Sequence, residues 1–184
     1  MRKFVCLFAM TFLFCLSAAA QGNSSGDVFA GYSYVRAHPA TSGAPSFNLN
    51  GGSGSLAWTP GPLGLVGDFG GYHVSKIGSA SVDANLFTYL FGPRLTLNRG
   101  GGLSPFAQAL FGGAHISNAT LGGSGTSANT FAAALGAGLD WNASRHFGIR
   151  LGQADYLLTR FEEGPNNRKT QNNLRISAGI VFRF

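Results

Sequence analysis

The sequence predicts an all-β fold, a transmembrane up-and-down barrel of eight antiparallel strands. Charged residues make up only 11% of the 184-residue chain, and 28 residues are glycine, whereas soluble domains carry about 25% charged residues. After residue 20 no apolar run approaches the roughly 20 residues of a helical span. Segments of alternating apolar and polar or small residues recur instead. In a bilayer, strands must close into a barrel to pair every backbone group.

Residues 1–20 are predicted to be a cleavable signal peptide. A basic start is followed by an apolar run that ends at Leu16 and by small residues at Ala18–Ala20, as a signal peptidase requires. The apolar run is too short to span a bilayer as a helix. Cleavage would lower the formal net charge from +6 to +4, because two basic residues are lost. It would also remove Cys6 and Cys15, so we expect no disulfide in the mature chain.

Eight strands are predicted in the barrel segment 27–184, after a short lead at residues 21–26. They cover residues 27–36, 48–58, 63–75, 83–97, 103–116, 128–142, 146–160 and 171–184. Short connections rich in turn residues lie at 59–62, 98–102 and 142–145, and they alternate with longer ones at 37–47, 76–82, 117–127 and 161–170. Short periplasmic turns and longer outer loops are the barrel pattern, and an even strand count places both termini in the periplasm.

The strand at 128–142 shows most clearly which face meets lipid. Phe131, Leu135 and Trp141 belong to an apolar set at odd positions, whereas the even positions are small residues and Asp140. The apolar set is therefore predicted to face lipid, and the other set to face the lumen. Small interior residues fit a narrow bore.

Aromatic residues are predicted to form a girdle at each membrane interface, because amphipathic rings favour that position. At the periplasmic end the predicted members are Trp58, Trp141, Phe147 and Phe182, with Phe106 and Phe184 beside them. Toward the longer loops they are Tyr34 and Tyr72, with Phe87, Phe131 and Phe161. The alternative is that these rings form the core of a soluble β-sandwich.

The same alternation predicts a charge network in the lumen. Its expected members are Asp68, Arg94, Asp140, Arg150, Arg175 and Arg183. An eight-stranded barrel is just wide enough for side chains to fill it, and an isolated buried ion costs several kcal/mol. We therefore expect Asp/Arg pairs that plug the bore. A static plug is favoured over a gate whose pairs exchange partners to admit small ions.

One segment breaks the alternation. Gln153 and Asp155 fall in phase with Phe147, which is expected to face lipid. A β-bulge between them would turn Asp155 inward, since bulges re-aim side chains. We expect either this bulge or a position of Asp155 above the hydrocarbon.

The sequence gives little support for catalysis or for metal binding. His38, His73 and His115 lie near the outer ends of the first, third and fifth strands, but these strands are not neighbours around a barrel, so a three-histidine metal site is not favoured. No zinc-protease or serine-hydrolase motif occurs. Residues 122–126 resemble a phosphate loop only in their glycines, and no Lys/Arg run suggests nucleic-acid binding. We expect no enzyme activity, no cofactor and no metal.

The last strand carries a family resemblance. Leu174, Ile176, Ala178, Ile180 and Phe182 alternate with polar or small residues, and the strand closes on Phe184. It resembles the final strand of bacterial outer-membrane barrels. With the signal peptide and the eight segments, the chain after residue 26 resembles the OmpA/OmpX-like eight-stranded superfamily.

The resemblance implies a monomer in the bacterial outer membrane, surrounded by outer-membrane lipids and lipopolysaccharide. It also implies insertion by the outer-membrane assembly machinery, for which Phe184 would be the assembly signal. Because Phe184 ends the sequence, we expect no C-terminal periplasmic domain and no peptidoglycan-anchoring role.

Two function classes follow from these features. The first is a structural or surface-interaction barrel, and the alternative is a narrow pore for ions or small solutes gated by interior Asp/Arg pairs. Outer loops of about 7 to 11 residues are too modest for high-affinity protein capture, whereas a plugged bore disfavours an open pore. An enzyme at the outer rim is a distant third. If Asp140 and Arg94 close the bore, replacing both with Ala is predicted to raise ion conductance.

Overall fold

The computed structural model describes residues 26–38, 47–77, 80–98, 101–120, 125–162 and 168–184. Within these ranges it describes the side chains except at 38, 74–77, 80–84, 118–120, 125–126, 128, 161–162 and 168–170. The predicted signal peptide lies outside the described residues.

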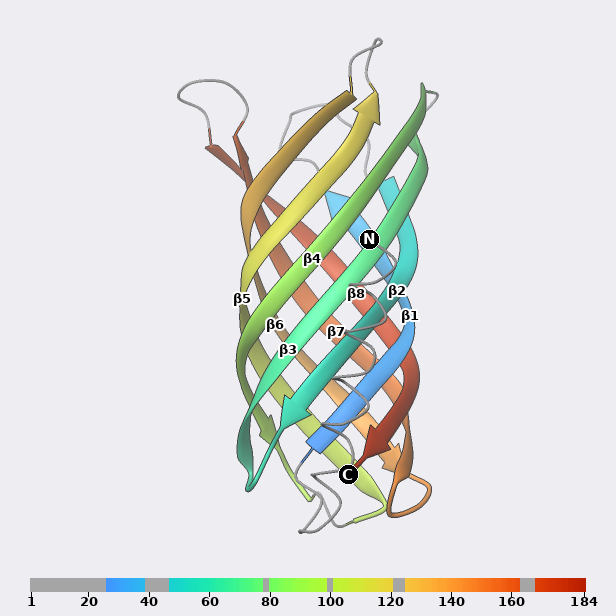
Figure 1. Ribbon diagram of the computed structural model, residues 1–184, viewed down its shortest axis with the longest axis vertical. Coiled ribbons are helices and arrows are strands. Elements are labelled where there is room, and N and C mark those ends of the chain that lie inside the picture. The colour runs from blue at the N-terminus through green and yellow to red at the C-terminus, as the bar shows by residue number, and fades with distance from the viewer. Residues whose placement is uncertain (1–25, 39–46, 78–79, 99–100, 121–124, 163–167) are drawn as a thin grey trace, which may run out of the picture.

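Eight antiparallel strands form one closed barrel in sequence order, as Figure 1 shows. They are β1 (Gly26–His38), β2 (Phe47–Trp58), β3 (Leu63–Ile77), β4 (Ala80–Thr96), β5 (Leu103–Thr120), β6 (Gly125–Asn142), β7 (Phe147–Glu162) and β8 (Arg168–Arg183). Each strand pairs with the next, and β8 pairs with β1. The predicted fold class is confirmed.

The observed strands reach further toward the longer connections than predicted. β5 continues to Thr120 instead of residue 116, and β8 begins at Arg168 instead of residue 171. The added residues are mostly polar on both faces, so alternation could not reveal them. No helix of sufficient length and hydropathy to cross a membrane occurs in these ranges.

The exterior of the barrel is apolar, whereas the interior combines polar side chains with two buried apolar clusters, one around Leu90 and Leu110 and one around Val35 and Leu49. On β6, Leu135 is 67% exposed, whereas Ala134 is 4% exposed. The same alternation runs along every strand and leaves large aromatic and aliphatic side chains on the outside. An exposed apolar surface of this extent is what a lipid-facing wall requires.

Glycines on the inner face make room for larger side chains. A Cβ atom on Gly136 would overlap the carboxylate of Asp155, and one on Gly138 would overlap the ring of Phe106. Small residues at these β6 positions therefore let bulky groups from neighbouring strands fill the bore.

β7 contains the predicted bulge. The β6–β7 register shifts between Leu139 and Asp140, because β7 holds one extra residue at Leu151. The ladder between β7 and β8 shifts over the same stretch. Arg150 before the bulge and Asp155 after it are consequently both buried inside the barrel.

Candidate functional site

Charged side chains of both signs fill the lumen. Among the described residues, the buried ones are Asp27, Asp68, Asp140, Asp155, Arg94, Arg150, Arg175 and Arg183. Each occupies an inward position in the alternation of its strand. The aspartates and arginines are equal in number, so this set is neutral as a whole. We call these residues, with Gln108, Gln153, Asn142 and Tyr72, the lumen network.

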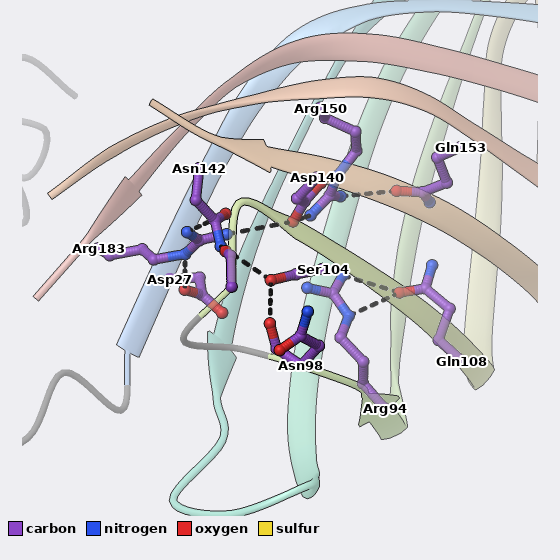
Figure 2. A network of polar contacts seen from close by, with 11 residues as sticks. Asp27, Arg94, Asn98, Ser104, Gln108, Asp140, Asn142, Arg150, Gln153 and Arg183 are labelled. Atoms are coloured by element: carbon purple, nitrogen blue, oxygen red, sulfur yellow. Dashed lines mark hydrogen bonds and ion pairs between the residues drawn. The ribbon is translucent and has the colours of Figure 1, made fainter. Parts of the chain in front are cut away.

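One part of the lumen network lies near the short connections, and Figure 2 shows it. Arg150 binds Asp140 through two bonds, Nε to Oδ1 at 2.8 Å and Nη2 to Oδ2 at 3.2 Å. The Nε of Arg183 lies 3.2 Å from Asp27 Oδ1, and its Nη2 lies 3.9 Å from Asp140 Oδ2. Arg183 also donates to Asn142. These contacts tie β6 and β7 to the β1–β8 seam.

Two glutamines carry the network onward. Gln153 accepts a 2.6 Å hydrogen bond from Arg150 Nη1 and donates to Asp155 Oδ2 at 2.7 Å. Gln108 donates to the other oxygen of Asp155 at 3.1 Å. The Oε1 of Gln108 accepts from Nε and Nη2 of Arg94 at 3.1 and 2.8 Å. The amide of Gln153 therefore links Arg150 to Asp155, and that of Gln108 links Arg94 to Asp155. Each amide gives hydrogen-bond partners to buried polar groups that do not contact each other directly.

Arg175 joins two carboxylates in the other part of the network. Its Nε donates to Asp155 Oδ2 at 2.9 Å, and its Nη1 donates to Asp68 Oδ1 at 2.6 Å. The hydroxyl of Tyr72 accepts a longer bond of 3.4 Å from the same Nη1. Arg175, Asp68 and Asp155 are each at most 1% exposed. A chain of polar contacts thus runs from Asp27 on β1 to Asp68 on β3.

Two phenylalanines pack on the guanidinium groups. The Arg150 guanidinium carbon lies 4.2 Å from the ring centre of Phe29 and 4.4 Å from that of Phe106. The corresponding distance from Arg94 to Phe106 is 4.6 Å. Cation–π contacts of this kind become stronger when the charge is desolvated. The prediction that Phe106 belongs to the interface girdle is wrong, since its inward position places it in the lumen.

The six charges predicted to face the lumen are all buried there, but one expected pair does not form. Asp140 binds Arg150 and Arg183, whereas Arg94 binds Gln108. Asp27, Gln108, Gln153 and Asn142 also belong to the network and were not predicted as members. A signal for Asp27 was present, because it alternates with the outward-facing Val28 at the start of β1.

The predicted girdle residues divide between the two faces. Trp58, Trp141, Phe147 and Phe182 are exposed on the exterior near the short connections. Tyr34 is half-buried on the outer face of β1. Tyr72, however, is only 3% exposed and lies inside the barrel. Because Phe69 faces outward, an even position such as 72 faces inward on β3, and the prediction for Tyr72 is wrong.

Phe184 closes the seam of the barrel. Its backbone exchanges two hydrogen bonds with Gly26, of 3.0 and 3.1 Å. Both ends of the barrel segment therefore lie together, beside the short connections (Figure 1).

The histidines whose side chains are described do not gather at one place. His73 Nδ1 lies 3.1 Å from Asn85 Oδ1, and His115 Nδ1 lies 2.7 Å from Asn129 Oδ1, both on the outer face. The side chain of His38 lies outside the described ones. Within the described part of the chain, no three His, Cys, Asp or Glu residues are placed to hold a metal ion.

A closed eight-stranded barrel with an apolar exterior and an interior filled by side chains, many of them charged, defines an integral membrane β-barrel. The sequence profile of the family described as outer membrane protein beta-barrel domain matches residues 6–184. The chain belongs to this family, and the protein is a barrel of the bacterial outer membrane.

Solved structures share the fold. Neisserial surface protein A (NspA) superposes with a TM-score of 0.67 at 19% identity, over 89% of this chain and 100% of that one. Ail, the attachment invasion locus protein of Yersinia pestis, gives a TM-score of 0.60 at 19% identity over the same shares. The outer membrane protein OprG from Pseudomonas aeruginosa gives 0.60 at 11% identity, over 89% and 98%. At these identities the likeness concerns the fold alone. No curated protein matches the chain.

Proposed function

We propose that this protein is a structural and surface-interaction barrel of the outer membrane whose bore is closed by the lumen network. The observation that carries the proposal is the unbroken chain of contacts from Asp27 to Asp68, which joins side chains from five strands across the lumen. A branch through Gln108 and Arg94 adds two more strands. The narrow pore is the competing function.

The geometry of the network supports a static plug over a gate. Arg150 and Arg175 are fully buried, and each contacts two polar side chains by hydrogen bonds of 2.9 Å or shorter. An ion that crosses the bore would have to separate these pairs, and breaking a buried pair costs about 3–5 kcal/mol.

The proposal includes the orientation and the surroundings of the barrel. The termini and short connections lie in the periplasm, and the longer connections face outward, as in known barrels of this kind. The barrel is a monomer among outer-membrane lipids and lipopolysaccharide. β8, which ends beside Phe184, is the strand presented to the assembly machinery.

Single-channel recording in planar bilayers tests the plug. The unmodified barrel should show no conductance steps. Replacing both Arg150 and Arg175 with Ala removes two of the largest fully buried side chains and should open a measurable conductance. Arg145→Ala, in the exposed turn before β7, is the matched control and should stay closed.

Heat-dependent gel mobility must first show that each variant is folded. Conductance steps in the unmodified barrel would contradict the plug and support the pore. A folded double variant without conductance would show that these two arginines do not close the bore.

A further inference from the structure

Arg94 differs from the other arginines of the lumen network because it has no carboxylate partner among the described residues. It is only 2% exposed, yet it forms no ion pair with a described residue. Arg150, Arg175 and Arg183 each bind at least one aspartate. A guanidinium that is removed from water without a counter-ion is strongly destabilising. The charge of Arg94 therefore requires compensation by a group outside the lumen network.

The contacts of Arg94 satisfy only part of its guanidinium. Its Nε and Nη2 both donate to one atom, Oε1 of Gln108, at 3.1 and 2.8 Å. Its Nη1 makes no hydrogen bond with a described residue. Gln108 carries no charge, and its amide nitrogen donates to Asp155. The two N–H groups of Nη1 and one positive charge thus remain available to a ligand.

The aromatic neighbour of Arg94 does not supply the counter-charge. The ring centre of Phe106 lies 4.6 Å from the guanidinium carbon of Arg94 and 4.4 Å from that of Arg150. A ring attracts a cation through its quadrupole but has no net charge. Arg150, which packs on the same ring, has the same sign as Arg94 and adds repulsion.

The charges of the lumen network divide unevenly along the bore. The set around Arg175 holds one arginine and two aspartates, a formal charge of −1, and its Asp155 also accepts hydrogen bonds from two neutral amides. The set near the short connections holds three arginines and two aspartates, a formal charge of +1. Its members are Asp27, Asp140, Arg94, Arg150 and Arg183. The surplus positive charge lies on Arg94, since the other two arginines of this set are paired.

A second donor beside Arg94 also has no partner. The hydroxyl of Thr96 is buried and makes no hydrogen bond with a described residue. Thr96 follows Arg94 by two positions on the same inner face of β4. In the view of Figure 2, the Arg94 guanidinium lies between Gln108 and the pair formed by Asn98 and Ser104. A guanidinium and a hydroxyl together fit a ligand that only accepts hydrogen bonds.

The site can be reached from the end with the short connections. Asn98 is exposed there, and Thr96 and Asn142 are half-buried. Toward the middle of the same two strands, Leu90 and Leu110 are fully buried. Because side chains fill a bore of eight strands, only a small ligand fits beside Arg94.

We propose that Arg94 binds one small inorganic anion of halide size, with Nη1 and the Thr96 hydroxyl as donors. The anion is the counter-ion that the lumen network lacks at the end with the short connections. A water molecule would accept the same hydrogen bonds but would leave the charge uncompensated. This inference rests on the proposed function for the role of the anion in the plug, whereas the binding itself is measured without conductance.

Crystallography of the full barrel with bromide in place of chloride is the direct test. Anomalous scattering at the bromine absorption edge should show a peak within hydrogen-bond distance of Arg94 Nη1. The absence of a peak at this place would overturn the inference, whether or not bromide is bound elsewhere.

Urea unfolding of the full barrel in phosphatidylcholine vesicles measures whether the anion stabilises the fold. Chloride is compared at equal ionic strength with gluconate, which is too large for a bore filled by side chains. Unfolding is followed by tryptophan fluorescence. At about a hundredfold excess over its dissociation constant, chloride should raise the midpoint by about 1 M urea. Equal midpoints in the two salts would indicate water in place of the anion and would contradict the proposal.

Variants assign the chloride effect to this site. Arg94→Gln keeps an amide donor but removes the charge, so it should lose the chloride shift. Arg145→Gln removes an exposed arginine from the turn before β7 and should keep the full shift. Thr96→Asp places a carboxylate beside Arg94, so it should abolish the chloride shift and raise the midpoint in gluconate.

A full chloride shift in folded Arg94→Gln would place the effect elsewhere and overturn the inference. If Arg94→Gln does not fold, Thr96→Asp gives the answer, and an unchanged chloride shift in that variant would overturn the inference as well. Conductance of the unmodified barrel would contradict the plug and would leave these outcomes unaffected, so the two failures are distinguishable.

Discussion

Arg175 illustrates how a membrane barrel can hold ions in a narrow interior. Its guanidinium lies between Asp68 and Asp155, and the second carboxylate also accepts hydrogen bonds from Gln108 and Gln153. Such a site is stable only as a set, because each buried charge depends on the others for its partner. Replacing a single member of the lumen network should therefore lower the free energy of unfolding.

Arg175→Met is expected to lower the free energy of unfolding by about 3–5 kcal/mol, because it leaves two buried carboxylates without their counter-ion. Urea unfolding of the barrel in vesicles, followed by tryptophan fluorescence, measures the change. Arg145→Met in the exposed turn should change it by no more than about 0.5 kcal/mol.

A companion variant separates charge from packing. Adding Asp68→Asn and Asp155→Asn to Arg175→Met should recover part of the lost stability, since no unpaired carboxylate remains. Similar stabilities of Arg175→Met and the unmodified barrel would show that this ion pair does not support the fold.

At the scale of single strands, alternation along the sequence was sufficient to predict all eight elements and their order. The predicted face of a side chain was wrong where the residue type was used in place of its position in the alternation. Tyr72 and Phe106 were assigned to the interface because they are aromatic. The outward positions of Phe69 on β3 and Ala107 on β5 instead place both residues on the inner face. The ion pairs in the lumen could not be predicted either, because the order of the strands does not determine which arginine side chain reaches which carboxylate. Asp155 was predicted correctly, because the break in alternation before it indicated a bulge that turns its side chain inward.

Deletion of Leu151 is expected to be tolerated. It removes the extra residue of the β7 bulge, so Arg150 and Gln153 can keep their β8 partners Gly179 and Ser177 in an uninterrupted ladder. The folded band should persist on unheated gels. Deletion of Ala178 from β8 is the control, because that strand has no extra residue there and one of its lumen arginines would turn toward lipid. Equal loss of folding in both would contradict this account.

The whole molecule has two unlike ends, one aromatic with the short turns and one polar with the longer connections. This asymmetry, and not the lumen, is what should fix its direction in the membrane.

Single cysteines can establish that direction, because the chain after residue 20 has none. Ser127→Cys, near the start of β6 at the end with the longer connections, should react with a membrane-impermeant maleimide on intact cells. Ser144→Cys, in the turn before β7, should react only after the outer membrane is permeabilised. The reverse pattern would place the termini outside.

The lumen network joins the two ends of the chain, and this constrains how the barrel assembles. Asp27 and Arg183 are 156 residues apart, and Asp68 and Arg175 are 107 apart. Until β8 meets β1, Arg183 lacks Asp27 and Arg175 lacks Asp68, although Asp155 on the neighbouring strand β7 already lies beside Arg175. The unpaired groups must stay hydrated until then. Closure of the sheet and dehydration of its interior are therefore one event. A partly built barrel exposes its inward polar side chains to water, and their burial is complete only when the final strand is paired.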